Sequence, residues 1–66
     1  MKIKQVRTQS AVSFGGRCSN NFIEDQWTKI TLDTKTQLVT LTYTASYVQT
    51  ALIPLGNVAL LVLADE

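Results

Sequence analysis

Residues 13–21 carry the groups best suited to bind a charged ligand. They read Ser-Phe-Gly-Gly-Arg-Cys-Ser-Asn-Asn. Gly15 and Gly16 would let a ligand approach the backbone N–H groups closely, and Arg17 could clamp a phosphate or a carboxylate. The stretch lacks the Gly-Lys-Ser/Thr ending of a phosphate-binding loop and the spacing of a dinucleotide fingerprint. An anion site at these three residues therefore competes with a plain glycine turn in a polar loop.

The residue types needed for catalysis do not come together in this chain. Histidine, the usual general base and the commonest metal ligand, is absent from the 66 residues. Cys18 is the single cysteine, so it has neither a disulfide partner in the chain nor a base to activate it. Glu24 and Asp25 are adjacent and would point in different directions on a helical turn. We therefore expect a protein that is not an enzyme and that holds no metal and no cofactor.

Two runs of alternating residues, 27–33 and 38–43, predict an antiparallel hairpin in the middle of the chain. The apolar residues expected to face the core are Ile30, Leu32, Val39 and Leu41. A two-residue turn at residues 35–36 sets Leu32 opposite Val39. In the same register Thr31 stacks on Thr40 on the other face, so both faces are chemically consistent.

The remaining elements are short and nearly all extended. Strands are expected at residues 2–7, 11–14, 47–53 and 58–63, and an Asx-x-x-Glu capping pattern predicts one helical turn over residues 21–26. Sixty-six residues, 45% of them hydrophobic, indicate a single globular domain spanning residues 1–66. The fold class is all-β, with about five strands and at most one short helical turn. It is either an antiparallel meander or a small closed barrel of SH3-like or OB-like size.

Trp27 and Leu38 are expected on the face of the hairpin that points away from Ile30. An aromatic side chain on such a face is either covered by another segment or offered to a partner. We therefore treat Trp27 and Leu38 as candidate partner-binding residues, with a core position as the alternative.

Charge is divided unevenly along the chain although the total is only +1. Residues 1–20 hold Lys2, Lys4, Arg7 and Arg17 without any acid, whereas residues 21–66 carry a net charge of −3. A basic edge beside exposed aromatic rings could bind single-stranded nucleic acid through phosphate contacts and base stacking. The alternative is that the lysines of a first strand guard a sheet edge against aggregation.

The last apolar run, residues 58–63, presents large side chains on both of its faces when it is extended. A short helix capped by Asn57 is the alternative reading of the run. Because a small sheet usually buries only one face, the strand lies at the centre of a closed barrel or a second copy of the chain covers it. We expect a homo-oligomer with Leu61 and Leu63 at or near the contact.

No targeting or membrane segment is evident in the sequence. Residues 51–64 form the most apolar stretch, but Pro54, Gly56 and Asn57 interrupt it, and a membrane-spanning helix needs about 20 apolar residues. The charged start is not followed by the apolar region of a signal peptide. We therefore expect a cytoplasmic protein without a membrane partner.

The threonine-rich hairpin followed by Ala-Leu-Ile-Pro-Leu-Gly-Asn-Val at residues 51–58 resembles the compact β-meanders of small orphan proteins encoded by bacteriophages. This resemblance covers residues 28–63 and is one of overall texture. It implies a protein of the host cytoplasm that binds and modulates a host macromolecule. The leading hypothesis is thus a non-catalytic modulator or inhibitor of a host protein. A small nucleic-acid-binding barrel and a structural component of an oligomer are the alternatives.

Overall fold

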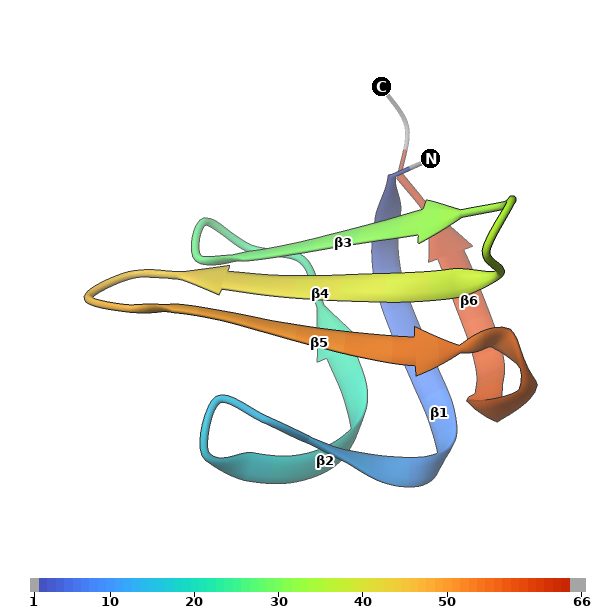
Figure 1. Cartoon of the computed structure of the whole chain (residues 1–66), viewed down its shortest axis with the longest axis horizontal. Coiled ribbons are helices and arrows are strands. Elements are labelled where there is room, and N and C mark those ends of the chain that lie inside the picture. The colour runs from blue at the N-terminus through green and yellow to red at the C-terminus, as the bar shows by residue number, and fades with distance from the viewer. Residues whose placement is uncertain (1, 65–66) are drawn as a thin grey trace.

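The computed structural model describes residues 2–64. Within them six strands form two three-stranded antiparallel sheets, ordered β2-β1-β6 and β3-β4-β5 (Figure 1). The elements in chain order are β1 (Ile3–Phe14), β2 (Arg17–Ile23), β3 (Thr28–Asp33), β4 (Leu38–Thr44), β5 (Val48–Pro54), the 3-10 helix η1 (Leu55–Asn57) and β6 (Val58–Leu63). The predicted all-β fold class, with at most one short helical turn, is confirmed.

The strands of one sheet run across those of the other, so the two sheets pack in the orthogonal manner (Figure 1). An isolated bridge between Lys2 and Thr31 joins the start of β1 to β3. The ladders otherwise stay within each sheet, and residues 2–64 do not close into a barrel. Of the two all-β forms that the sequence allows, the SH3-like or OB-like closed barrel is therefore not the one formed.

The central hairpin has the register that its alternation predicts. Ile30 pairs with Leu41, Leu32 with Val39, and Thr31 with Thr40. The turn is longer than the expected two residues, because Asp33 and Leu38 form the last pair and residues 34–37 make the connection. The Asp33 carboxylate accepts a hydrogen bond from the backbone N–H of Lys35 at 2.9 Å, and Gln37 takes a left-handed φ of 58°. An Asx turn thus replaces the two-residue hairpin turn without shifting the register.

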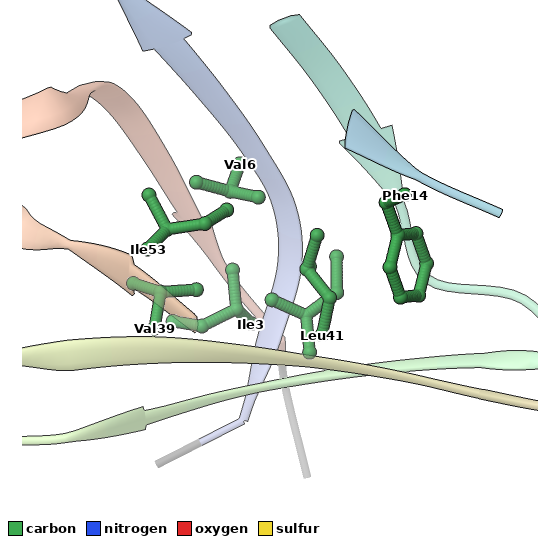
Figure 2. Packing of buried hydrophobic residues seen from close by; sticks show 7 residues of the cluster. Ile3, Val6, Phe14, Val39, Leu41 and Ile53 are labelled. Atoms are coloured by element: carbon green, nitrogen blue, oxygen red, sulfur yellow. The ribbon is translucent and has the colours of Figure 1, made fainter. Parts of the chain in front are cut away.

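Seven apolar side chains form the buried core between the sheets (Figure 2). They are Ile3, Val6, Phe14, Ile30, Val39, Leu41 and Ile53. β1 alone supplies three of them, and the other four come from the inner face of the β3-β4-β5 sheet. Leu32 is half-buried and packs against this cluster, so the predicted inner face of the hairpin is confirmed.

β1 is one bent strand and not the two short strands that the sequence suggested. Its register against β2 shifts between Arg7 and Val12, where β1 has more residues than its partner. In this bend the buried Thr8 hydroxyl donates to the Ser10 carbonyl oxygen at 2.7 Å. The Asn57 side chain forms two hydrogen bonds to the backbone of Ser10. Its Oδ1 accepts from the Ser10 N–H at 2.8 Å, and its Nδ2 donates to the Ser10 carbonyl oxygen at 3.2 Å.

The helical turn predicted over residues 21–26 is wrong, because β2 runs through to Ile23. Asn21 pairs with Arg7 and Phe22 with Val6 across the β1–β2 ladder. The β1–β2 hairpin, which turns at Gly15 and Gly16, forms in place of the helical turn that the capping pattern predicted. The reason is that the half-buried Phe22 packs on the core only when the chain is extended. The single helical turn within residues 2–64 is η1, which is three residues long.

β6 has the predicted bounds, but it does not lie at the centre of a closed barrel, which was one of the two expected ways of covering both of its faces. It lies at the edge of the β2-β1-β6 sheet, and none of its residues is fully buried. Leu61 and Val58 pack partly against the core, whereas Leu60 and Leu63 are 44% and 55% exposed. The register shift between Arg7 and Thr8 breaks strict alternation along β6, so its two faces do not follow the odd and even positions.

Leu41→Ala should lower the free energy of unfolding by about 2–5 kcal/mol, because it empties a fully buried position between the sheets. Leu52→Ala is the matched control, since Leu52 is 59% exposed on β5 and should cost far less. Urea denaturation followed by circular dichroism measures both. Equal losses for the two variants would contradict the assignment of the core face.

Asn57→Ala should destabilise the chain by about 1–3 kcal/mol, because it removes both hydrogen bonds to the backbone of Ser10 in the β1 bend. Asn20→Ala serves as the control, since Asn20 is exposed and its side chain forms no hydrogen bond within residues 2–64. Amide hydrogen exchange at Ser10 should accelerate only in the Asn57 variant. Unchanged exchange at Ser10 would show that the bend does not depend on this side chain.

Candidate functional site

Three chain connections gather at one end of the molecule. They are the β1–β2 turn at residues 15–16, the β2–β3 connection at residues 24–27 and the β4–β5 connection at residues 45–47, all on the left in Figure 1. The turn at residues 34–37 and η1 lie at the opposite end. Binding residues commonly sit on loops that a rigid scaffold positions, which makes this end the candidate site.

A cleft of about 470 Å³ lies between the β1–β2 hairpin and the β3–β4 hairpin at this end. β1 and β2 supply most of its wall, and Thr28 of β3 and Tyr43 of β4 supply the rest. Its aromatic lining residues are Phe14, Phe22 and Tyr43, and its polar ones include Arg17, Ser19 and Asn21. The volume is in the range of clefts that take a small ligand or a side chain of a partner.

Four aromatic rings form a continuous chain from the cleft to its rim. Phe14 meets Phe22 edge-on with ring centroids 6.0 Å apart, and it meets Tyr43 edge-on at 6.4 Å. Tyr43 in turn contacts Tyr47 at 5.4 Å with the rings tilted by 50°. Tyr47 is 52% exposed on the β4–β5 connection, so the chain of rings joins the buried core to an accessible aromatic surface.

The glycine turn presents Arg17 to the cleft but offers fewer free donors than the sequence suggested. Gly15 and Gly16 adopt left-handed φ values of 65° and 76°, which gives the hairpin geometry that only glycine adopts readily. The Gly15 N–H already donates to Gln49 Oε1 of β5 at 2.8 Å, so it is not open to an anion in this arrangement. The Arg17 side chain is exposed, and its guanidinium forms no hydrogen bond or ion pair within residues 2–64. The guanidinium is therefore the main candidate for an anion-binding group at the turn.

Backbone hydrogen bonds hold Trp27 in the β2–β3 connection. The Asp25 carboxylate accepts from the N–H groups of Trp27 and Thr28, both at 2.8 Å. The Trp27 carbonyl oxygen accepts from the N–H of Thr44 at 2.9 Å. The indole is 48% exposed, so a positioned aromatic side chain stands at the same end of the molecule as Tyr47. Asp25 is thus a turn residue that positions Trp27.

Trp27 and Leu38, which the sequence placed on one face, lie at opposite ends of the β3-β4-β5 sheet. Trp27 stands beside Thr44, and Leu38 is six residues away along β4, between Asp33 and Pro54. At about 3.3 Å per residue the two positions are roughly 20 Å apart. Leu38 is half-buried. Of the predicted binding residues, Gly15 and Arg17 therefore line the cleft. Gly16 and Trp27 lie in connections at the same end without lining it, and Leu38 lies outside the candidate site.

The four basic residues of the N-terminal third do not form one patch. Arg17 lines the cleft, whereas Lys2 lies at the opposite end of β1, bridged to Thr31. Lys4 and Arg7 are exposed along β1 between them, and Arg7 pairs with both Asn21 and Leu60. Only one of the four positive charges therefore reaches the aromatic surface.

Sequence reasoning missed the apolar side of the site on β2. Phe22 lines the cleft, and so does the exposed Ile23, both in the segment expected to be helical. The Gly15–Gly16 pair was the available signal, because two glycines after a strand favour a tight hairpin whose return strand would include both residues. Cys18 also lines the cleft and is exposed.

Within residues 2–64, no group of three or more histidine, cysteine, aspartate or glutamate side chains is arranged to hold a metal ion. The same part of the chain contains no helix long and apolar enough to cross a membrane. Comparisons with protein-family models, with curated proteins and with solved structures find no match to this chain.

Gly16→Ala should destabilise the chain by about 1–2 kcal/mol, because an L-residue resists the left-handed conformation. A Cβ at this position would meet nothing within 4 Å, so the cost would be purely conformational. Gly56→Ala is the control, since that position is equally open and has no left-handed φ. Gly16→Asn should recover part of the loss, because asparagine tolerates this conformation better. Thermal denaturation of the three variants tests this, and equal effects at both glycines would contradict the turn geometry.

Proposed function

We propose that this chain is a non-catalytic binding protein that holds a short segment of a protein partner in the cleft. The observation that supports this proposal is the position of the exposed Arg17 in an aromatic-lined cleft, one of whose rings, Tyr43, contacts the accessible ring of Tyr47. The exposed Trp27 belongs to the β2–β3 connection at the same end but does not line the cleft. Arginine, tryptophan and tyrosine are the residues that most often carry binding energy at protein interfaces. The Tyr47 ring is also connected to the core through Tyr43 and Phe14, which lowers the entropy lost when a partner immobilises it.

The chemistry of the cleft favours an apolar or aromatic side chain beside an acidic residue. The rings of Phe22 and Tyr43 offer apolar contact, and the Arg17 guanidinium can pair with a carboxylate in a bidentate manner. Asn21 Oδ1 already accepts from Gln5 at 2.8 Å, and the Ser19 hydroxyl is bonded to the Asn21 backbone. These bonds hold the polar wall in place and leave the Asn21 Nδ2 group as a further donor to the partner.

The groups that the cleft contains support a proposal of binding without chemical turnover. Its thiol, Cys18, has no histidine anywhere in the chain that could activate it. The resemblance of residues 28–63 to small bacteriophage proteins implies that the partner is a macromolecule of the bacterial host. We propose that the chain modulates this partner by occupying one of its surfaces.

Nucleic-acid binding is the second candidate, and one observation favours it. Arg17 lines the same cleft as Tyr43, so a base could stack on a ring while the guanidinium holds a phosphate. The dispersal of Lys2, Lys4 and Arg7 along β1 predicts few simultaneous phosphate contacts. A nucleic-acid complex of this kind would therefore be weak.

The test begins with capture of partners from a bacterial lysate on the immobilised protein, followed by titration calorimetry with the purified partner. Arg17→Ala and Tyr47→Ala should each weaken binding at least about tenfold, as expected for residues at the centre of an interface. Arg17→Ala should leave the free energy of unfolding within about 0.5 kcal/mol, the usual range for surface positions. Tyr47→Ala should lower it by about 0.5–1.5 kcal/mol, because it removes the ring contact with Tyr43. Leu52→Ala, an exposed position on β5 that does not line the cleft, should leave affinity within twofold.

Salt separates the two candidates. A single-stranded oligonucleotide held by phosphate contacts should lose affinity steeply between 50 and 200 mM salt, by a logarithmic slope of about −0.7 per phosphate. A protein partner held by the aromatic cleft should show a shallow slope. If Arg17→Ala and Tyr47→Ala both left the affinity unchanged, the proposed site would be overturned for either partner.

A further inference from the structure

The outer edge of β6 differs from every other sheet edge in the described chain. The two sheets leave four edge strands, β2, β6, β3 and β5. β2 carries Arg17, β3 carries Lys29 and Asp33, and β5 ends in Pro54. Charges and proline are the usual devices that prevent an edge from pairing with another strand. β6 reads Val-Ala-Leu-Leu-Val-Leu and has neither.

The backbone of β6 directs one set of hydrogen-bonding groups to this free edge. The Ala64 N–H donates to the Lys2 carbonyl oxygen at 3.2 Å, so residue 64 faces β1. Consecutive residues of a strand direct their backbone groups to alternate sides. The N–H and C=O groups of Leu61 and Leu63 therefore point away from β1, where residues 2–64 provide no further strand.

The side chains along this edge are apolar on both sides of the sheet. Leu60 lies opposite Arg7 on the outer side and is 44% exposed. Leu61 lies opposite the buried Val6 and packs partly against the core. A strand that extends the sheet here must therefore be apolar on both sides and must bring no charge to the edge.

We propose that β6 pairs antiparallel with β6 of a second copy of the chain about a two-fold axis at Leu61. A second copy supplies the required strand, because β6 is the one edge strand within residues 2–64 that has neither charge nor proline, and β4, which also lacks both, is paired on both sides. When a two-fold axis relates two copies of one strand, opposite side chains lie on the same face of the sheet only if the axis passes through a residue position. Leu61 is the central position of β6 whose backbone groups face the free edge. Leu60 then lies opposite Val62 of the second copy, and Leu61 lies opposite its own equivalent.

This surface is separate from the proposed binding cleft, because β2 and β6 flank β1 on opposite sides. Pairing through β6 joins the two β2-β1-β6 sheets into one of six strands with a cleft near each end. Such a dimer presents two clefts to its partners.

Sedimentation equilibrium over a wide concentration range tests the proposal. The parent should pass from one chain of 7.3 kDa to twice that mass as concentration rises. Leu60→Lys should raise the dissociation constant at least about tenfold, because it places two ammonium groups on diagonal positions across the axis. Leu52→Lys is the matched control, since it puts the same charge at an exposed leucine on β5 and should leave the dissociation constant unchanged. Leu61→Glu is less suited, because Leu61 contacts the core and the change would also unfold the chain.

Hydrogen exchange distinguishes edge pairing from stacking of exposed faces. The amides of Leu61 and Leu63 should exchange rapidly in the monomer and become protected as the dimer forms, whereas the amide of Leu60, on the side facing β1, should not change. A single species of 7.3 kDa at all concentrations would overturn the proposal. A dimer that forms without protection of Leu61 and Leu63, or that Leu52→Lys weakens as much as Leu60→Lys, would overturn it as well.

Discussion

The bend of β1 at residues 8–11 is the constraint on which the rest of this structure depends. One strand must pair with β6 along its first half and with the start of β2 along its second, while three of its side chains cover the β3-β4-β5 sheet. A straight strand of 12 residues would carry one end away from the core. The bend leaves backbone groups without ladder partners, and the Thr8 hydroxyl and the Asn57 side chain satisfy those of Ser10.

The candidate cleft is a consequence of that bend. The bend places the Gly15–Gly16 turn beside β5, where Gln49 accepts a hydrogen bond from the Gly15 N–H. It also places the Phe14 ring in contact with both Phe22 and Tyr43. Arg17 then lies in a cleft whose aromatic wall the core supports. A small chain without a catalytic constellation in its sequence can in this way still present a shaped surface that is a candidate for binding.

The two proposed surfaces lie on opposite sides of β1 and can therefore act together. The cleft uses β2 with the β3–β4 hairpin, and self-association uses the free edge of β6. A dimer would offer two clefts to a partner that repeats its binding segment, and the second contact would form at a high effective concentration. Such avidity would allow a weak cleft of about 470 Å³ to hold a partner firmly.

The sequence by itself determined the all-β class, the central hairpin and the bounds of β6, because side-chain alternation acts over a few neighbouring residues. Ile30 and Leu41 face the core in the predicted register for that local reason. Only the tertiary structure decided that β6 is an edge strand, that residues 21–23 are extended and that Leu38 lies far from Trp27. These outcomes depend on which strands meet across the sheets and on register shifts in β1, and a shift of one residue exchanges the faces of a strand. Contacts between residues distant in the chain, such as Ser10 with Asn57 and Gly15 with Gln49, select one arrangement and leave no local pattern in the sequence.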